Sequence, residues 1–274
     1  MEKPVAISVI IACYNQGEYI EEMLESVFSQ TFTDFEVIIV NDGSTDNTRK
    51  LLDRIRHPKL TVIHSGNHGP SHARNLAIAH ASAEIIMNLD ADDKIAPTLF
   101  EKACQVFADN PNAGIVYADV EFFGAKSGIF ELDYSLRNML YENRIISQAF
   151  FRREDWQITG GYCEQLRHGL EDWDFWLSIL ELKREPVKIP EVLIYYRVYN
   201  DWRKSRSGRL IESRGKQMDT WLTIFHRHQE LFASYPEDWE KFAAHAQRIE
   251  NETFLIRLLK DLYYKISRRI STHE

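Results

Sequence analysis

Strand-like and helix-like segments alternate from the N-terminus as far as Asp90. The strand-like segments are short apolar runs, several of them rich in β-branched residues, which is typical of strands buried on both faces of a parallel sheet. Between these runs, apolar residues recur at helical spacing. The four predicted strands are Val5–Ala12, Phe35–Val40, Leu60–His64 and Ile85–Leu89. This alternation predicts an α/β fold with right-handed crossovers and helices on both faces of the sheet.

The alternation stops after Asn110, where short strands follow one another. A glycine-bounded segment at 124–128 predicts a hairpin turn, and we interpret this region as a mixed or antiparallel extension that supplies a second substrate pocket. Strands are predicted at Gly114–Tyr117, Val120–Phe123, Ile129–Leu132, Ala149–Phe151 and Val192–Tyr199, and helices at 97–108, from 169 onward, at 210–228, 237–248 and 253–269. The region around Trp156 is predicted to be an irregular loop. The predicted divisions are 1–110, 111–205 and 206–274.

Composition narrows the class of protein. The chain has 44% hydrophobic and 27% charged residues and a formal net charge of -8, which argues against a general nucleic-acid binder. Its three cysteines form no CxxC pair, so neither a zinc knuckle nor a disulfide framework is expected. No signal peptide and no run of 18 apolar residues is present, and we therefore expect a cytoplasmic location.

Three carboxylates, Asp90, Asp92 and Asp93, follow the fourth predicted strand directly. In open α/β sheets, ligands bind outside the carboxyl ends of the strands. Alternate residues of an extended segment point the same way, so Asp90 and Asp92 can face one ligand while Ala91 leaves room for it. Clustered carboxylates repel one another unless a cation lies among them, which favours Mg²⁺ or Mn²⁺ bound together with substrate phosphates. The alternative is that Asp92 or Asp93 caps the helix predicted near Pro97.

Two other polar loops, around Tyr14 and Asp42, are predicted at the same edge of the sheet, an arrangement that suits a nucleotide. Neither GxxxxGK[ST] nor GxGxxG occurs, so the phosphates must be held in another way. Tyr14 can lie against a base, Asp42 can accept a hydrogen bond from its imino group, and Arg74 can bond a base carbonyl. Asp90 can bind the ribose hydroxyls, which leaves Asp92 for a metal ion that bridges a diphosphate.

A nucleoside diphosphate clamped by a metal ion is a good leaving group on a sugar, because the ion stabilises the departing charge. The attacking hydroxyl then needs a general base, and the candidate is Asp172 in the acidic segment 171–174. The alternative is a structural one, in which Asp172 interacts with the N-terminus of the helix that begins there.

Three other features have two interpretations. The segment Trp202–Lys216 is rich in Lys and Arg and predicts either a flap that closes on phosphates or a solvated linker. The basic amphipathic segment at 253–269 predicts a helix packed on the catalytic core or, alternatively, peripheral contact with an anionic membrane. His68 and His72 have a spacing that can bind zinc on a helix, but Gly69 and Pro70 between them argue against it.

Five motifs in this order resemble family 2 glycosyltransferases of the GT-A fold. They are Ile7–Asn15, Val40–Asp46, Asn67–Asn75, Leu89–Asp93 and Glu171–Trp176. The resemblance covers roughly residues 5 to 200 and implies an open, mostly parallel twisted sheet flanked by helices. Its first half would be Rossmann-like and its second a mixed, acceptor-binding half, with a C-terminal helical extension beyond.

The resemblance also implies a role for each site residue. It places the base and ribose against nucleotide-binding residues, assigns Mn²⁺ or Mg²⁺ to Asp92, and makes Asp172 the base of an inverting displacement. The implied nucleotide-binding residues are Ala12, Tyr14, Asp42, Arg74, Asp90 and Ala91. Asn41 stands where the family commonly has Asp, and the Gln-x-x-Arg-Trp pattern of processive synthases is absent. A single addition to the acceptor is therefore the better inference.

The predicted function is transfer of a sugar from a nucleotide diphosphate, with a UDP-sugar as the favoured donor. The predicted acceptor is a hydroxyl of a glycan or lipid-linked glycan in surface polysaccharide synthesis. One alternative is a sugar-nucleotide nucleotidyltransferase, but Ala12–Asn15 is not the glycine-rich basic loop that such an enzyme normally has after its first strand. Another is a non-catalytic glycan- or nucleotide-binding module, against which the presence of both Asp92 and Asp172 argues.

Overall fold

The computed structural model describes residues 4–131, 134–201 and 214–235. The chain divides into two compact units, with residues 1–133, 145–167 and 171–200 in the first and 134–144, 168–170 and 201–274 in the second. The predicted helices at 237–248 and 253–269, and most of the predicted flap at 202–216, lie outside the described residues. The predicted site residues all belong to the first unit.

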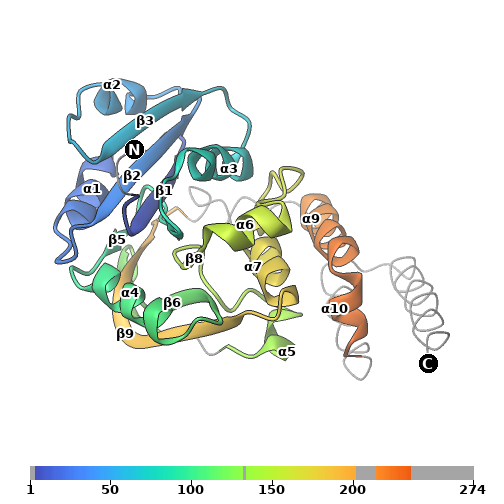
Figure 1. Ribbon diagram of the computed structural model, residues 1–274. Coiled ribbons are helices and arrows are strands. Elements are labelled where there is room, and N and C mark those ends of the chain that lie inside the picture. Colours follow the sequence, from blue (N-terminus) through green and yellow to red (C-terminus); the bar gives the residue numbers. More distant parts are fainter. Residues whose placement is uncertain (1–3, 132–133, 202–213, 236–274) are drawn as a thin grey trace. The chain divides into compact units, whose positions relative to one another are not determined.

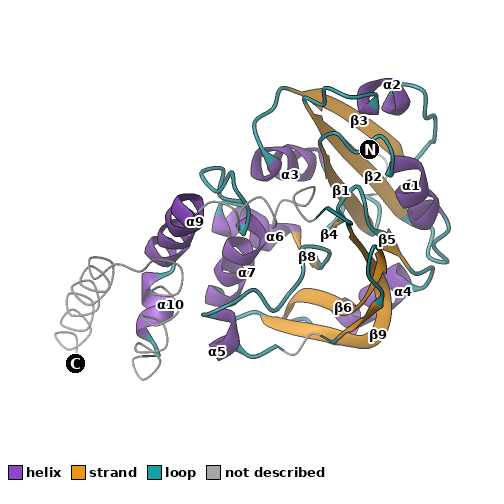
Figure 2. Ribbon diagram, turned by 180° about the vertical axis from the view of Figure 1, so that it is seen from behind, coloured by secondary structure: helices purple, strands orange, loops and turns teal. Residues whose placement is uncertain are grey.

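One mixed sheet of nine strands runs through the described part of the first unit, in the order β3-β2-β1-β4-β8-β6-β9-β5, with β7 paired to β6 (Figures 1 and 2). Its strands are β1 Ile7–Cys13, β2 Phe35–Asp42, β3 Leu60–Ser65, β4 Ile85–Asn88, β5 Lys94–Ile95, β6 Ala113–Gly124, β7 Gly128–Phe130, β8 Phe150–Arg152 and β9 Glu185–Val198. The β3-β2-β1-β4 half is parallel throughout, as predicted.

Helices cover both faces of the parallel half. α1 joins β1 to β2 and α3 joins β3 to β4, and these right-handed crossovers run in opposite directions along the sheet, which places the two helices on opposite faces (Figure 1). The helices of the first unit are α1 Ile20–Phe28, α2 Thr48–Leu52, α3 Pro70–His80, α4 Leu99–Asp109, α6 Arg153–Thr159 and α7 Glu171–Glu181; those of the second unit are α5 Leu136–Met139, α9 Arg214–Arg227 and α10 Gln229–Ala233.

The second half of the sheet is mixed. β8 pairs antiparallel with both β4 and β6, whereas the long curved strands β6 and β9 pair parallel to each other (Figure 2). Where two short strands are predicted, β6 is a single strand with register shifts at Ala118 and Asp119. The bulge explains why the sequence predicts a gap between two strands here, because the polar Asp119 lies at the bulge and is buried. Its carboxylate pairs with Lys188 Nζ at 2.9 Å. The predicted loop around Trp156 is also wrong, since Trp156 lies in α6.

Aromatic side chains join α7 to the sheet. Phe175 lies edge-on to Phe151 of β8, with ring centroids 5.0 Å apart, and its ring centroid is 4.3 Å from that of Tyr162. Trp173 and Trp176 are also buried. This packing holds the first turn of α7, which carries Asp172, against the sheet.

No helix in the described parts of the chain has both the length and the apolar character needed to cross a bilayer. The cytoplasmic location predicted from the sequence stays a prediction. The segment at 253–269, predicted to pack on the core or to contact a membrane, lies outside the described residues.

Candidate active site

Hydrogen bonds join the three loops that follow β1, β2 and β3. Asn15, after β1, accepts at Oδ1 from the backbone N–H of Thr45, 2.8 Å away, and its own backbone N–H donates to Ser44 Oγ at 2.9 Å. Asp42, at the end of β2, accepts from the backbone N–H groups of His68 and Gly69, each at 2.9 Å. The polar loops around Tyr14 and Asp42 therefore lie at one edge of the sheet, as expected from the parallel order.

Gly43 makes this junction possible. Its φ of +71° lies in the left-handed region that favours glycine, and a Cβ there would lie only 2.6 Å from the backbone nitrogen of Asn67. The close approach of the second and third loops thus requires glycine at this position.

The residues predicted to hold the base differ in exposure. Tyr14 is 43% exposed directly after β1, which leaves its ring free to lie against a planar ligand, and Ala12 is half-buried near the end of β1. Asp42 is buried, and each of its oxygens already accepts one backbone N–H. A base N–H would therefore have to use a remaining lone pair of Asp42.

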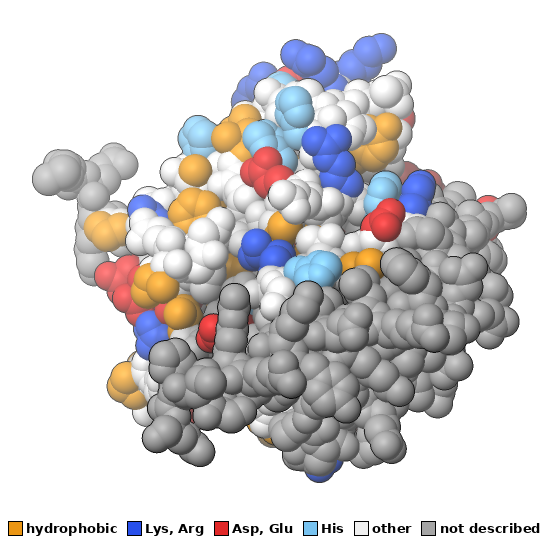
Figure 3. Space-filling model, turned by 90° about the vertical axis from the view of Figure 1, so that its right-hand side faces the viewer, with side chains coloured by type: hydrophobic (Ala, Val, Ile, Leu, Met, Phe, Trp, Pro, Cys, Tyr) orange, Lys and Arg blue, Asp and Glu red, His pale blue; other side chains and the backbone are white. Residues whose placement is uncertain are grey.

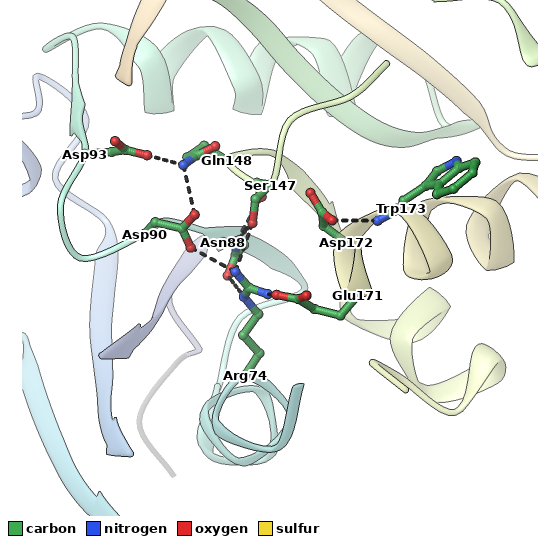
Figure 4. A network of polar contacts seen from close by, with 9 residues as sticks. All are labelled: Arg74, Asn88, Asp90, Asp93, Ser147, Gln148, Glu171, Asp172 and Trp173. Atoms are coloured by element: carbon green, nitrogen blue, oxygen red, sulfur yellow. Dashed lines mark hydrogen bonds and ion pairs between the residues drawn. The ribbon is translucent and has the colours of Figure 1, made fainter. Parts of the chain in front are cut away.

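Arg74 connects the two acidic segments predicted from the sequence. Its side chain is only 1% exposed, and it projects from α3 into a polar network (Figure 4). The guanidinium donates to Asp90 Oδ1 at 2.8 Å and to Glu171 Oε1 at 2.6 Å. It also donates to Asn88 Oδ1 at 2.9 Å and to Ser147 Oγ at 3.0 Å.

These four hydrogen bonds use most of the donors of Arg74, and its predicted contact with a base carbonyl stays a prediction. Its donors point at side chains of the protein, and burial with two carboxylate partners makes it a fixed counter-ion. The same contacts bring Asp90, after β4, next to the first turn of α7. The sequence predicted that both acidic segments serve one site, and Arg74 is the residue that joins them.

Asp172 lies beside this network in the first turn of α7 (Figure 4). Its Oδ1 accepts the backbone N–H of Trp173 at 2.9 Å, so the structural role at the start of the helix is present. Burial raises the pKa of Asp172 to about 7, and the neighbouring Glu171 adds to the increase while Arg74 opposes it. A carboxyl with a pKa near neutrality can accept a proton from a hydroxyl and release it again.

Gln148 connects Asp90 to Asp93. The Gln148 amide donates to Asp90 Oδ2 at 3.1 Å and also to Asp93 (Figure 4). Asp93 is buried and accepts the backbone N–H of Arg197 at 2.7 Å, and burial together with Asp92 and Asp90 raises its pKa. Asp93 therefore anchors the loop to β9. Ala91, between the acids, is buried.

Asp92 is half-buried and meets the end of β9. The Tyr199 hydroxyl donates to Asp92 Oδ2, and Arg197 Nε donates to the Asp92 backbone carbonyl at 2.8 Å. Burial raises the pKa of Asp92, and the nearby charge of Asp90 raises it further. Neither Asp92 nor Asp93 caps α4, which begins at Leu99 with Thr98 at its N-cap and no side-chain cap bond.

Several residues of this site were not predicted from the sequence. In the sequence, Glu171 stands out only as part of an acidic segment, and Ser147 and Gln148 lie in a stretch without a recognisable motif. Arg197 and Tyr199 lie at the far end of a strand, and no motif predicts that this end meets Asp92 and Asp93. The antiparallel pairing of β5 with β9 places this end beside Asp92 and Asp93.

Asn75 holds the glycine loop that follows α6. Its amide nitrogen donates to the Tyr162 backbone carbonyl at 2.9 Å, and its Oδ1 accepts the Trp156 indole N–H at 3.0 Å. Tyr162 packs over the Arg74 guanidinium, 5.4 Å from the ring centroid. Consecutive residues of α3 thus position two different parts of the site.

Histidine side chains lie beside acidic and basic ones on the described part of one face (Figure 3). The ring centroids of His68 and His72 are 4.8 Å apart, and His72 Nδ1 lies 3.2 Å from Glu164 Oε2. Within the described residues, no group of three or more His, Cys, Asp or Glu side chains is arranged to hold a metal ion.

Comparisons with known proteins add to this geometry. The family model described as Glycosyl transferase family 2 matches residues 8–164. The chain is 28% identical over 183 residues to chondroitin synthase from Pasteurella multocida (strain Pm70), a match covering 64% of this chain and 19% of the synthase. It is 30% identical over 218 residues to teichoic acid poly(glycerol phosphate) polymerase from Staphylococcus epidermidis, covering 70% and 28%. The chain thus spans less than a third of the length of these relatives.

Solved structures resemble the chain over almost its whole length. The S. aureus TarS 1-349 complex with UDP-GlcNAc matches with a TM-score of 0.64 and 18% identity, covering 98% of this chain and 92% of that one. Mannosyltransferase PcManGT from Pyrobaculum calidifontis, in complex with GDP-Man and Mn²⁺, gives 0.60 and 23%, covering 94% and 79%. At these identities the likeness establishes the fold.

Proposed function

The chain belongs to glycosyl transferase family 2, and from this premise we propose that it transfers a sugar from a UDP-sugar to a glycan hydroxyl with inversion at the anomeric carbon. The predicted resemblance is thereby confirmed, as is the GT-A-type fold, which the solved neighbours share. The donor, the acceptor, the metal ion and the role of each residue are parts of the proposal.

The observation that carries the proposal is the Arg74 network. It brings Asp90, at the nucleotide-binding edge, within one side chain of the α7 turn that contains Asp172 (Figure 4). Transfer requires a donor site and a base next to each other, and these two acidic segments are distant in the sequence. Binding alone would not require a buried carboxyl with a pKa near 7.

The donor nucleotide would lie along the edge formed by the first three loops and the acidic loop. Tyr14 would cover the base, Asp42 would accept its imino hydrogen, and Ala12 and Ala91 would line the site. Asp90 would bind the ribose, and Arg74 would fix the Asp90 carboxylate from behind. The neighbouring structures named for UDP-GlcNAc and GDP-Man support a nucleotide-sugar donor.

We assign a hard divalent cation to the acidic loop because of the chemistry of its side chains. Asp92 offers carboxylate oxygen, and its pKa is raised by burial and by Asp90, a repulsion that a cation would relieve. Asp92 would hold Mn²⁺ or Mg²⁺ together with the donor phosphates, and the bound ion would offset negative charge on the diphosphate. The complex of PcManGT with Mn²⁺ supports a metal-dependent family member.

Asp172 would act on the acceptor. Its carboxylate takes the proton of the acceptor hydroxyl while that oxygen forms a bond to the anomeric carbon. The bond from the anomeric carbon to the diphosphate oxygen breaks on the opposite side, and its electron pair leaves with the nucleoside diphosphate. Attack from the side opposite the leaving group inverts the configuration.

Different observations argue against the two alternative functions. Family membership argues against a sugar-nucleotide nucleotidyltransferase. A non-catalytic binding module would need no base, so retained binding with lost transfer in an Asp172 variant separates it from an enzyme. The relatives named as chondroitin synthase and teichoic acid polymerase support a role in surface polymer synthesis.

Donor binding tests the proposal directly. With Mn²⁺ present, UDP-sugars are expected to raise the Tm more than GDP- or dTDP-sugars, because a ligand that binds only the native state stabilises it. In Asp92→Ala, the Mn²⁺-dependent part of this increase is expected to disappear. A larger shift with a GDP-sugar would exclude the UDP assignment, and an unchanged Mn²⁺ effect in the variant would remove Asp92 from metal binding.

Tyr199 is expected to compete with the cation for Asp92, because its hydroxyl donates to Asp92 Oδ2. Tyr199→Phe removes this hydrogen bond to a charged group and should tighten Mn²⁺ binding about tenfold, as measured by Mn²⁺ paramagnetic resonance. Tyr19→Phe is the matched control, since Tyr19 packs edge-on against Tyr199, with ring centroids 5.8 Å apart. Weaker Mn²⁺ binding in Tyr199→Phe would mean that the hydroxyl supports the site.

A further inference from the structure

Three aromatic rings lie side by side on one face of the sheet, each on a different strand. They are Phe130 of β7, Phe122 of β6 and Tyr196 of β9, here called the aromatic row. Phe122 is directly opposite Tyr196 in the β6–β9 register, and Val120, two residues before Phe122, is opposite Phe130. Phe122 and Phe130 are stacked, with ring centroids 5.7 Å apart, whereas Phe122 and Tyr196 meet edge to face, with ring centroids 6.0 Å apart and an interplanar angle of 77°.

The inner end of the row adjoins the active site. Immediately after Tyr196, the Arg197 backbone N–H donates a hydrogen bond to the Asp93 carboxylate, and the Tyr199 hydroxyl donates one to the Asp92 carboxylate. The environment of the Tyr196 hydroxyl agrees with this placement, because burial raises its pKa and four carboxylates raise it further. These carboxylates are Asp93, Asp90, Asp92 and Asp172.

The outer end of the row is exposed. Phe130 is 41% exposed, and all three residues of β7 are exposed. Phe130 therefore contributes little to a folded core, yet its ring is stacked on Phe122 with an interplanar angle of 23°. A series of aromatic contacts thus leads from the neighbourhood of the acidic residues to solvent, where a long acceptor would have to approach.

We propose that the aromatic row binds the acceptor, and that the acceptor is a chain of pyranose rings. This inference rests on the proposed function, because it assumes that Asp172 activates an acceptor hydroxyl at the inner end of the row. Sugar rings present apolar C–H faces with hydroxyls at their edges, and large flat aromatic side chains offer a matching surface. A glycerol phosphate chain has no such ring face.

Binding to the aromatic row would therefore distinguish the two kinds of acceptor chain that the names of the relatives suggest. A chondroitin-type chain consists of sugar rings, whose C–H faces can pack against the exposed Phe130 ring and the ring edges beside it, whereas a poly(glycerol phosphate) chain has no such faces. Binding should accordingly grow with the number of sugar rings and should depend on Phe130. It should not depend on Ile129, which is 64% exposed on the same short strand and points to the opposite face.

Hexasaccharides of chondroitin, hyaluronan and chitin are suitable probes, with a glycerol phosphate hexamer as the comparison. Binding to the full chain is measured by calorimetry with UDP and Mn²⁺ present. At least one hexasaccharide is expected to bind the wild type, and Phe130→Ala should weaken that binding roughly tenfold. Ile129→Ala should leave it unchanged, and Phe130→Trp should keep it.

Other results would overturn the assignment. The assignment fails if none of the three hexasaccharides binds, or if Phe130→Ala binds them as tightly as the wild type. It also fails if the glycerol phosphate hexamer binds in a way that depends on Phe130. Dimerisation of the wild type that Phe130→Ala abolishes would likewise exclude it. UDP binding to the wild type distinguishes the two proposals. If UDP binds and the hexasaccharides do not depend on Phe130, the row alone is wrong; if UDP does not bind, the proposed function fails as well.

Discussion

Asp172→Asn is expected to lower kcat for sugar transfer by about 10³ while leaving the Kd of the donor nucleotide nearly unchanged. The amide cannot accept the proton of the acceptor hydroxyl, so the loss falls on the chemical step. Asparagine keeps the size of the side chain, and its Oδ1 can still accept the Trp173 backbone N–H. Rapid-mixing measurement of transfer, with calorimetry of UDP binding, separates the two effects.

The same carboxyl is expected to set the pH dependence of the wild type. A base with a pKa of about 7 is active when ionised, so kcat/KM should rise with pH through about 7 and then level off. The charged groups acting on Asp172 are Glu171, Arg74 and Asp90, and the Tyr162 and Tyr196 hydroxyls also interact with it electrostatically. This rise should be absent from the residual activity of Asp172→Asn.

Stability provides a check that does not depend on activity. The pKa of Asp172 is raised on folding, so its contribution to stability is present at low pH and is lost as the pH rises through about 7. Asparagine cannot ionise, and Asp172→Asn should therefore be more stable than the wild type above pH 7. Urea unfolding at pH 6 and pH 8.5 measures the difference.

Asp172→Ala is the matched control for the structural alternative. It removes both the base and the acceptor for the Trp173 N–H, so it should lose stability as well as activity. If Asp172 served only the start of α7, Asp172→Asn would transfer sugar at nearly the wild-type rate. Equal loss of UDP binding and transfer in Asp172→Asn would likewise remove it from the role of base.

The parallel half of the fold was predictable because each of its strands and helices leaves a pattern in a short stretch of sequence. Buried strands such as β1 and β2 are continuous apolar runs, and the handedness of the crossovers then places their carboxyl ends at one edge. The mixed half depends on pairing between distant segments. The end of β9 meets Asp92 and Asp93 beside the two-residue strand β5, which pairs with β9 but is too short to leave a sequence pattern.

The site follows the same division. Asp42 ends β2, and Asp90 and Asp92 follow β4, so their place at the edge of the parallel half could be inferred from the sequence. The surroundings of Arg74 could not, because its partners Glu171 and Ser147 come from distant segments without a shared motif. An arginine in the first turns of a helix such as α3 can equally contact a ligand or a carboxylate of the protein, and only the folded structure decides between them.

Arg74→Met is expected to lower the free energy of unfolding by about 3–5 kcal/mol, the largest stability effect among the substitutions considered. The variant leaves Glu171 buried without its 2.6 Å partner and Asp90 without its 2.8 Å partner. Desolvated carboxylates that lose their counter-ion cost far more than the hydrogen bonds themselves are worth. Urea unfolding followed by the fluorescence of the buried Trp173 and Trp176 measures the loss.

Two further variants show whether uncompensated charge is the cause. Arg152 is a half-buried arginine of the same sheet, and within the described residues its hydrogen bonds go to neutral backbone carbonyls. They include those of Ala113 at 2.9 Å and Pro111 at 3.1 Å, so Arg152→Met should lower the free energy of unfolding clearly less. Adding Glu171→Leu to Arg74→Met removes one of the stranded charges and should restore part of the stability, a non-additive result that cavity formation alone would not give. If the double variant were less stable than Arg74→Met by the full cost of Glu171→Leu alone, Arg74 would act through packing, and its role as the counter-ion joining the donor edge to α7 would have to be abandoned.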